Sequence, residues 1–279
     1  MKPFLKWAGG KSALVGEIAA AFGPDKCSGV YHEPFLGSGA VFFGLKAKGL
    51  ISDASLSDSN FRLASLFQSV RMMPHQVSNG LSLMPSGPGW ANSYYEIREK
   101  YNQDSKLAPS FEQSVRFIWL NRACFNGLYR ENKSGDFNVP KGSYKQLSLP
   151  PRAAIACAAA ALRDTLINSN SAIDAYTFDE CGGDWMYLDP PYAPLNSTSF
   201  TSYTGARFGV DEHRALAARA LEAVQRGVKV VVSNHDTPFV RELYSEDYWE
   251  LRPMNVRRSI GAGRSAAQAP ELLIVGRSR

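Results

Sequence analysis

Short runs rich in β-branched and aromatic residues alternate with helical patterns along most of this chain. Such alternation is typical of an α/β fold with a largely parallel sheet, because crossover helices connect successive parallel strands. The expected strands are Val30–Glu33, Ser55–Asp58, Trp185–Asp189, Val228–Ser233 and Leu272–Val275. The expected helices are Ser12–Phe22, Ala40–Lys48, Phe61–Val70, Tyr94–Tyr101, Phe111–Arg122, Arg152–Leu166 and Asp211–Arg226. We therefore predict a doubly wound α/β domain.

The stretch from about residue 70 to residue 151 interrupts this alternation. It holds two of the expected helices, many Gly, Ser, Pro and Asn residues, and a cluster of basic side chains. We interpret it as an insertion, so that a catalytic domain in two parts, 1–69 and 152–279, flanks an inserted domain at 70–151. The run Ala153–Leu162 is wholly apolar but too short to span a bilayer, and it predicts a buried helix.

The net charge of +5 is unevenly distributed along the 279 residues. Residues 116–152 carry seven basic and two acidic side chains, and residues 252–279 carry six arginines against Glu271 alone. The rest of the chain is acidic on balance. Two basic stretches on an otherwise acidic chain suggest a polyanionic partner. The alternative, that they are basic loops in contact with solvent alone, explains the charge distribution equally well.

The four cysteines lie far apart in the sequence, and no two of them form a Cys-x-x-Cys pair. This spacing argues against a disulfide framework and against a zinc site. The four histidines share no ligand spacing either, so we expect no metal site. The N-terminal segment lacks the apolar run of a secretory signal. We therefore expect a cytoplasmic protein that does not associate with a membrane.

The segment Glu33-Pro34-Phe35-Leu36-Gly37-Ser38-Gly39 lies between an expected strand and an expected helix. Glycines in such a turn let a ligand approach the backbone closely. Asp58 ends the next expected strand, at about the distance where nucleotide-binding folds place an acid on ribose hydroxyls. Phe42 replaces the third glycine of the dinucleotide motif, which disfavours a pyrophosphate ligand. A nucleoside without phosphates, such as S-adenosylmethionine, fits these residues better.

The run Asp189-Pro190-Pro191-Tyr192 follows an expected strand and so belongs at the carboxyl edge of the sheet, where open α/β folds bind ligands. The two prolines stiffen the turn and remove backbone donors. What remains is two acceptors, the Asp189 carboxylate and the Pro190 carbonyl, beside the aromatic face of Tyr192. This set suits an amino group that donates two hydrogen bonds while its ring is stacked. A proline-rich turn with a buried tyrosine is the alternative explanation.

Aromatic residues, glycines and cations alternate between residues 125 and 145. Asn126-Gly127 and Ser134-Gly135 are turn signals and predict a β-hairpin or a long loop. Such a tract suits DNA, because cations contact phosphates, an arginine can read guanine and an apolar residue can wedge between bases. An exposed loop without a ligand is the alternative.

Taken together, these segments resemble the Dam family of DNA adenine-N6 methyltransferases, which includes bacterial and bacteriophage members. The resemblance is carried by Phe4–Lys11, Glu33–Gly39, Ser57–Asn60, Asn126–Arg130, Asp189–Leu195, Ser233–Thr237 and Val256–Ile260. Their order is that of the alpha group of amino-methyltransferases. The resemblance implies a Rossmann-like S-adenosylmethionine-dependent methyltransferase fold with an inserted, mainly helical target-recognition domain that carries a β-hairpin. It also implies transfer of a methyl group from S-adenosylmethionine to N6 of a flipped-out adenine in double-stranded DNA, in the sequence GATC.

The resemblance also assigns functional positions, residue by residue. The positions that match the cofactor site are Trp7, Lys11, Glu33, Pro34, Phe35, Gly37, Gly39, Asp58 and Asp189. The positions that match the DNA-binding site are Lys6, Phe125, Asn126, Leu128, Arg130, Pro140 and Tyr144. The catalytic motif is matched by Asp189, Pro190, Pro191 and Tyr192, with Tyr192 stacking on the flipped adenine.

Within the DNA-binding set, Lys6, Leu128 and Arg130 match the residues that read GATC, and Phe125 and Asn126 match those that fill the gap left by the flipped base. The chain departs from the family pattern at two positions. Ser143 stands where family members often carry an arginine that clamps the DNA backbone, and Phe125 replaces a tyrosine.

The acceptor set also suggests a mechanism. Adenine N6 is a poor nucleophile because its lone pair is delocalised into the ring. We expect Asp189 and the Pro190 carbonyl to accept its two hydrogens, so that positioning and electrostatics drive direct transfer without a covalent intermediate or a metal. We expect a monomer in solution.

Several alternatives stay open. Within the same class they are methylation of another DNA sequence, of cytosine N4 or of RNA. In other classes they are a nucleotide-dependent oxidoreductase and a catalytically silent DNA-binding protein.

Overall fold

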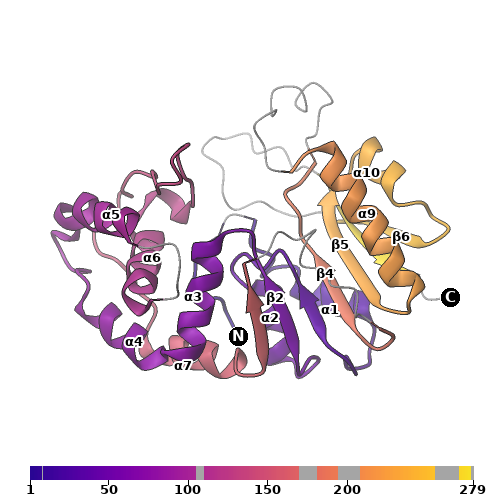
Figure 1. Cartoon of the computed structure of the whole chain (residues 1–279), viewed down its shortest axis with the longest axis horizontal. Helices are drawn as coiled ribbons and strands as arrows, with labels where there is room; N and C mark the ends of the chain where they lie inside the picture. Colours follow the sequence, from indigo (N-terminus) through magenta and orange to yellow (C-terminus); the bar gives the residue numbers. More distant parts are fainter. Residues whose placement is uncertain (8, 105–109, 170–180, 194–207, 255–269, 278–279) are drawn as a thin grey trace. The chain divides into compact units, whose positions relative to one another are not determined.

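The computed structural model describes residues 1–7, 9–104, 110–169, 181–193, 208–254 and 270–277 (Figure 1). Contacts between residues divide the chain into two compact units. The first unit comprises Met1–Ser12, Gly37–Ala47 and Asp58–Ser169, and the second comprises Ala13–Leu36, Lys48–Ser57 and Asn170–Arg279. The chain therefore passes between the units at five points. The predicted domain limits at 70 and 151 were drawn from the break in the alternation of strands and helices, and they stay a prediction.

Six strands lie side by side in the second unit, in the order β2-β1-β4-β5-β7-β6. Their bounds are β1 Tyr31–Glu33, β2 Ala54–Ser57, β4 Trp185–Leu188, β5 Lys229–His235, β6 Trp249–Met254 and β7 Glu271–Gly276. The strands β2, β1, β4 and β5 are parallel, and β7 runs antiparallel to both β5 and β6. The start of β7 therefore lies at the same edge of the sheet as the carboxyl ends of β1, β4 and β5.

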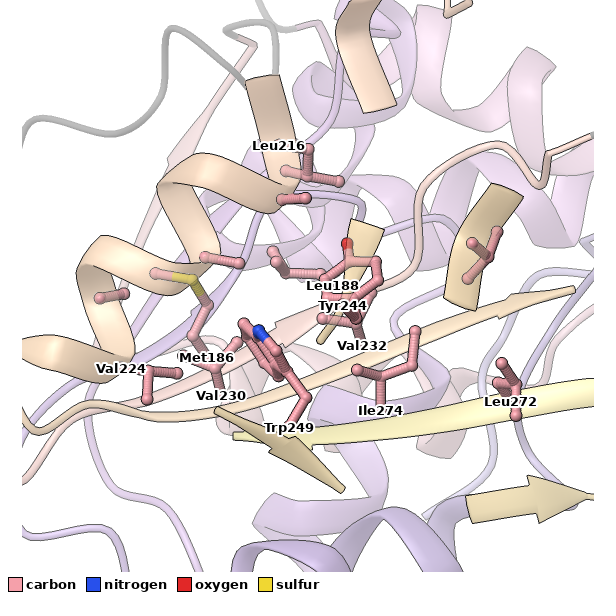
Figure 2. Packing of buried hydrophobic residues seen from close by; sticks show 14 of the residues in the cluster. Met186, Leu188, Leu216, Val224, Val230, Val232, Tyr244, Trp249, Leu272 and Ile274 are labelled. Atoms are coloured by element: carbon pink, nitrogen blue, oxygen red, sulfur yellow. The ribbon is translucent and has the colours of Figure 1, made fainter. Parts of the chain in front are cut away.

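The core of the second unit lies between the sheet and two helices, α9 (Val210–Gln225) and α10 (Pro238–Leu243). Figure 2 shows side chains from β4, β5 and β7 packed with Leu216 and Val224 of α9 and with Tyr244 and Trp249. The β-branched run of β5 favours a strand because such side chains pack well on a pleated surface. This unit also holds α1 (Val15–Phe22).

The first unit is mainly helical. It contains α2 Ala40–Ala47, α3 Phe61–Met72, α4 Pro74–Leu83, α5 Tyr94–Gln103, α6 Phe111–Ala123 and α7 Arg152–Ala161, the short strand β3 Thr165–Asn168, and 3-10 turns at Trp90–Ser93 and Phe125–Gly127. The close approach of α4 to α6 depends on Gly80, where a Cβ atom would lie 2.6 Å from Cγ2 of Val115.

The structure confirms the α/β class, and every predicted helix and strand is present with ends that differ by a few residues. The helix predicted at Arg152–Leu166 ends early, at Ala161, and Thr165 begins the unpredicted strand β3. The prediction of two helices in residues 70–151 is wrong, because α4 is a third. Its sequence is mostly polar and contains Gly80, so it lacks a clear helical pattern. The short helix α10 and the edge strand β6, which contains Pro253, were also not predicted.

The apolar run Ala153–Leu162 was predicted to form a buried helix. The helix is confirmed, but the prediction that it is buried is wrong. The helix α7 is present, but only Ile155 and Ala158 among its residues are buried. Alanine favours helices and carries little apolar surface, so an alanine-rich run tolerates exposure. None of the described helices has the length and apolarity that crossing a membrane requires.

The predicted β-hairpin near residue 130 is present as two isolated antiparallel bridges, Cys124 with Lys141 and Glu131 with Phe137. The backbone N–H of Asn138 donates to the carbonyl of Arg130 at 3.0 Å, which closes the tip of this hairpin.

Candidate functional site

Hydroxyl and carboxylate groups gather at the carboxyl edge of the sheet in the second unit. The hydroxyl of Tyr31 donates to Oε2 of Glu33 at 2.6 Å, and the hydroxyls of Tyr187 and Ser233 are hydrogen-bonded at 2.7 Å. Burial raises the pKa of Tyr187 well above its ordinary value, and the nearby charge of Asp189 adds to this. The hydroxyl therefore keeps its proton, and this edge is rich in oxygen acceptors.

The Asp-Pro-Pro-Tyr turn begins at this edge, directly after β4. Its far end is attached to β5, since the backbone N–H of Ala193 donates to Oδ1 of Asn234 at 3.0 Å. The carbonyl of Ala193 lies 2.6 Å from Nδ1 of His235 and accepts a hydrogen bond from it. Asp189 is half-buried and Pro190 is buried. The turn is thus stiffened by its prolines and fixed at both ends, which suits it to hold a substrate amine in one position.

The glycine turn of the first unit brings together three predicted cofactor residues. The backbone N–H of Gly37 donates to Oδ2 of Asp58 at 3.0 Å, and that of Asn60 donates to Oδ1 at 2.9 Å. A Cβ atom on Gly37, which has a φ of +50°, would lie 3.1 Å from Cδ1 of Trp7. Burial raises the pKa of Asp58. Trp7, Gly37 and Asp58 therefore form one packed group.

The remaining predicted cofactor residues are placed as follows. The ammonium group of Lys11 is buried in the first unit and donates to the carbonyl of Gly9 at 2.9 Å. Gly39, also in the first unit, has a φ of +70° and lies immediately before α2. In the second unit, Pro34 is buried and the Phe35 ring meets that of Phe208 edge-on at 5.7 Å.

All seven predicted DNA-binding residues lie in the first unit, and most of them belong to the loop that follows α6. Phe125 is 43% exposed, although it is a large apolar side chain. Asn126 has a φ of 54°, the only positive value among described residues other than glycine. The backbone N–H of Phe125 donates to the carbonyl of Pro140 at 2.9 Å, so the two sides of the loop are joined.

Arg130 is exposed near the tip of this loop. Its Nε donates to Oδ1 of Asn138 at 2.6 Å, which orients the guanidinium group. An oriented arginine and an exposed aromatic ring on one loop are the groups that a protein uses to read and wedge apart base pairs.

Asn121, which the sequence analysis did not single out, joins the N-terminal segment to this loop. Its Oδ1 accepts from the backbone N–H of Lys6 at 2.8 Å, and its Nδ2 donates to the carbonyls of Lys6 at 2.6 Å and Gly127 at 3.2 Å. The ammonium of Lys6 lies 4.7 Å from the centre of the Tyr144 ring. One buried amide therefore places Lys6 beside the other predicted DNA-reading residues.

An aromatic cluster lies next to this junction. The Trp7 ring lies 5.6 Å from that of Tyr129, and the Tyr129 ring lies 5.3 Å from that of Phe117, with nearly parallel planes. Tyr129 stands between Leu128 and Arg130 in the sequence. The ring of a predicted cofactor residue thus packs against a tyrosine that lies between two predicted base-reading residues in the sequence.

Three segments that carried the resemblance fall wholly or partly outside the described residues, at residue 8, residues 194–195 and residues 256–260. The same holds for most of the arginines in the basic tail, namely Arg257, Arg258, Arg264 and Arg279.

Comparisons with known proteins identify the family of the chain. Residues 7–260 match the family described as D12 class N6 adenine-specific DNA methyltransferase. The DNA adenine methylase of Escherichia coli K12 is 35% identical over 275 residues, which cover 98% of this chain and 94% of the relative. That of Vibrio cholerae O395 is 37% identical, covering 95% of this chain and 92% of the relative. The type II methyltransferase M.MjaIII of Methanocaldococcus jannaschii is 34% identical, covering 88% of each chain.

Proposed function

We propose, for a chain that belongs to the D12 class of N6 adenine-specific DNA methyltransferases, that S-adenosylmethionine is the methyl donor and GATC in duplex DNA is the target. The chain is a site-specific, adenine-specific DNA methyltransferase. The observation that carries the chemistry is the Asp-Pro-Pro-Tyr turn, fixed at the carboxyl edge of the sheet by Asn234 and His235. The expectations of a monomer and of a cytoplasmic location stay predictions.

The residues present suit S-adenosylmethionine as the donor. The glycine at position 37 lets the backbone lie close to the Trp7 indole, and its N–H orients the Asp58 carboxylate, which we propose accepts from the ribose hydroxyls. Glu33 is 2% exposed and offers a carboxylate for a cationic or amine-bearing ligand. We propose that Trp7, Lys11, Gly37, Gly39 and Asp58 hold the nucleoside part, and Glu33, Pro34, Phe35 and Asp189 the methionine part. When bound, the donor supplies a methyl group on a positively charged sulfur.

The residues of the turn then act on the target amine. Asp189 and the Pro190 carbonyl accept the two N6 hydrogens, while Pro191 keeps the turn rigid and Tyr192 stacks on the base. With the donor bound, its methyl group would pass from sulfur to N6, and the Asp189 carboxylate would accept the proton that N6 loses. Because the base must leave the duplex to reach these groups, unstacking costs a few kcal/mol, which contacts in the pocket offset.

We assign the predicted DNA-binding residues to three kinds of contact according to their side chains. We propose that Lys6, Leu128 and Arg130 contact base edges, that Phe125 and Asn126 fill the gap left by the flipped adenine, and that Tyr144 lies near the phosphates, with Pro140 supporting the loop. The exposed Phe125 ring and the oriented Arg130 support this assignment.

Methylation of GATC is tested directly on unmethylated plasmid DNA. After incubation with the protein and S-adenosylmethionine, we expect a nuclease that cuts only methylated GATC to digest the plasmid. A nuclease that cuts only unmethylated GATC is then expected to leave it intact. Incorporation of labelled methyl groups into adenine without a change at GATC would overturn the sequence assignment and leave the chemistry standing.

The methyl donor is tested by thermal unfolding. A ligand at about 100 times its Kd stabilises the folded state by about 2.7 kcal/mol, so S-adenosylhomocysteine is expected to raise Tm by several degrees. NAD at the same concentration is expected to leave Tm unchanged. An equal shift with NAD, or no shift with S-adenosylhomocysteine at millimolar concentration, would contradict the proposed donor.

A further inference from the structure

Glu271 is a carboxylate in a place where a charge is costly. It begins β7, whose next four residues are apolar and buried, and Glu271 itself is only 6% exposed. Burying an ionised carboxylate lowers stability unless partners compensate for the lost hydration. We therefore looked for a function that a carboxylate at this buried position serves.

The reversal of β7 brings this carboxylate to the catalytic turn. Glu271 pairs with His235 of β5 on one side and with Met254 of β6 on the other, so its main chain is held from both sides. Its Oε2 accepts a hydrogen bond from the Tyr192 hydroxyl at 3.0 Å. Burial raises the pKa of Tyr192, so the hydroxyl keeps its proton and remains a donor.

Two neighbours on β5 restrict the same tyrosine. The His235 ring lies 4.8 Å from the Tyr192 ring at an angle of 77°. Asn234 accepts from two backbone N–H groups, those of Ala193 and His235, which fixes the residue after the tyrosine. A ring on a fixed backbone still rotates about its side-chain bonds, and a hydrogen bond at its far end removes that freedom.

We propose that Glu271 is a positioning residue for methyl transfer, which holds the Tyr192 ring in the plane on which the target adenine stacks. This inference rests on the proposed stacking role of Tyr192. Positioning matters because N6 must meet the methyl group in line, and small displacements slow such reactions strongly.

The test compares Glu271→Ala, Glu271→Gln, Tyr192→Phe and the double variant Glu271→Ala/Tyr192→Phe. The control is Glu250→Ala, which removes an exposed carboxylate from the neighbouring strand β6, where Glu250 pairs with Arg252 at 2.8 Å. The rate of a single turnover is measured with labelled S-adenosylmethionine on unmethylated plasmid DNA. A plasmid contains many different short sequences, so this assay does not depend on the proposed GATC target. The Kd for DNA, the Kd for S-adenosylhomocysteine and Tm are measured alongside.

Loss of one hydrogen bond is expected to slow methyl transfer about tenfold in Glu271→Ala and in Tyr192→Phe, with both Kd values within about twofold of wild type. The double variant is expected to be slowed about tenfold, not about a hundredfold, because both changes remove the same bond. Glu271→Gln keeps an oxygen acceptor and is expected to restore most of the rate.

If the fold reduction in rate of the double variant equals the product of the two single reductions, the proposal is overturned. So would a wild-type rate in Tyr192→Phe, and this holds even if Glu271→Ala fails to fold. Failure of the underlying assignment has a different signature, because Tyr192→Ala would then transfer methyl groups at the wild-type rate. A wild-type protein that transfers no label would instead contradict the proposed donor.

Discussion

Replacing Asp189 by alanine is expected to slow methyl transfer about 100- to 1,000-fold while changing the free energy of unfolding by less than about 1 kcal/mol. The reason is that Asp189 lies half-buried directly after β4, where we propose that its carboxylate accepts a hydrogen from the substrate amine. The rate of a single turnover on plasmid DNA and urea unfolding measure the two quantities separately.

The same strand supplies a matched control. Asp184 stands just before β4 at its other end, is 4% exposed, and accepts from the backbone N–H groups of Val30 at 2.7 Å and Cys181 at 3.3 Å. Asp184→Ala is expected to lower the free energy of unfolding by about 1–3 kcal/mol, because it leaves these part-buried hydrogen bonds without an acceptor. Its transfer rate at a temperature where it is folded is expected to stay near wild type. A near-normal rate in Asp189→Ala would rule out the catalytic assignment.

Replacing Arg130 by alanine is expected to remove about 1–3 kcal/mol of discrimination at one guanine of the target site. Arg130 is exposed, and Asn138 holds its Nε, which presets the guanidinium for a planar contact with a base. The measurement is the ratio of kcat/KM on a GATC duplex to that on duplexes with a single changed base.

Arg152→Ala is the matched control for this change. Arg152 is also exposed, also belongs to the first unit, and also donates to an asparagine, from Nη2 to Oδ1 of Asn79 at 2.6 Å. It lies outside the loop after α6, so its loss is expected to leave the ratio unchanged. If Arg130→Ala keeps wild-type selectivity, or if both variants lose it equally, Arg130 does not read the site.

The parts of this fold that could be predicted from the sequence depend on local patterns. The strand β5 was predicted because its β-branched run is uninterrupted, and the Asp-Pro-Pro-Tyr turn because proline and acceptor chemistry lie within four residues. The strand β6 was missed although its apolar and charged residues alternate, because Pro253 disfavours a strand except at the edge of a sheet. The antiparallel direction of β7 has no local signal, because strand direction depends on a connection elsewhere in the chain.

The two residues that sequence reasoning missed at the sites share one property. Asn121 contacts Lys6 across 115 residues, and Glu271 contacts Tyr192 across 79 residues. In both cases the only sequence signal is a polar residue at the end of an apolar run, since Asn121 follows four apolar residues of α6 and Glu271 precedes four of β7. That signal indicates a buried polar contact but does not name the partner, since the partner is fixed by tertiary packing.

The chain passes between its two units five times, and this restricts how recombination between related genes can exchange the preference for a DNA sequence. Lys6 and the loop after α6 belong to one unit, but residues of the other unit separate them in the gene. A recombined fragment that covered 58–169 would import a relative's loop and keep the host's side chain at position 6. The Asn121 bonds to that position go to main-chain atoms, so they would form again wherever the imported fragment also carries asparagine at position 121. Because we propose that position 6 and the loop after α6 both contact bases, such a mosaic is expected to combine contacts from two relatives at one target site.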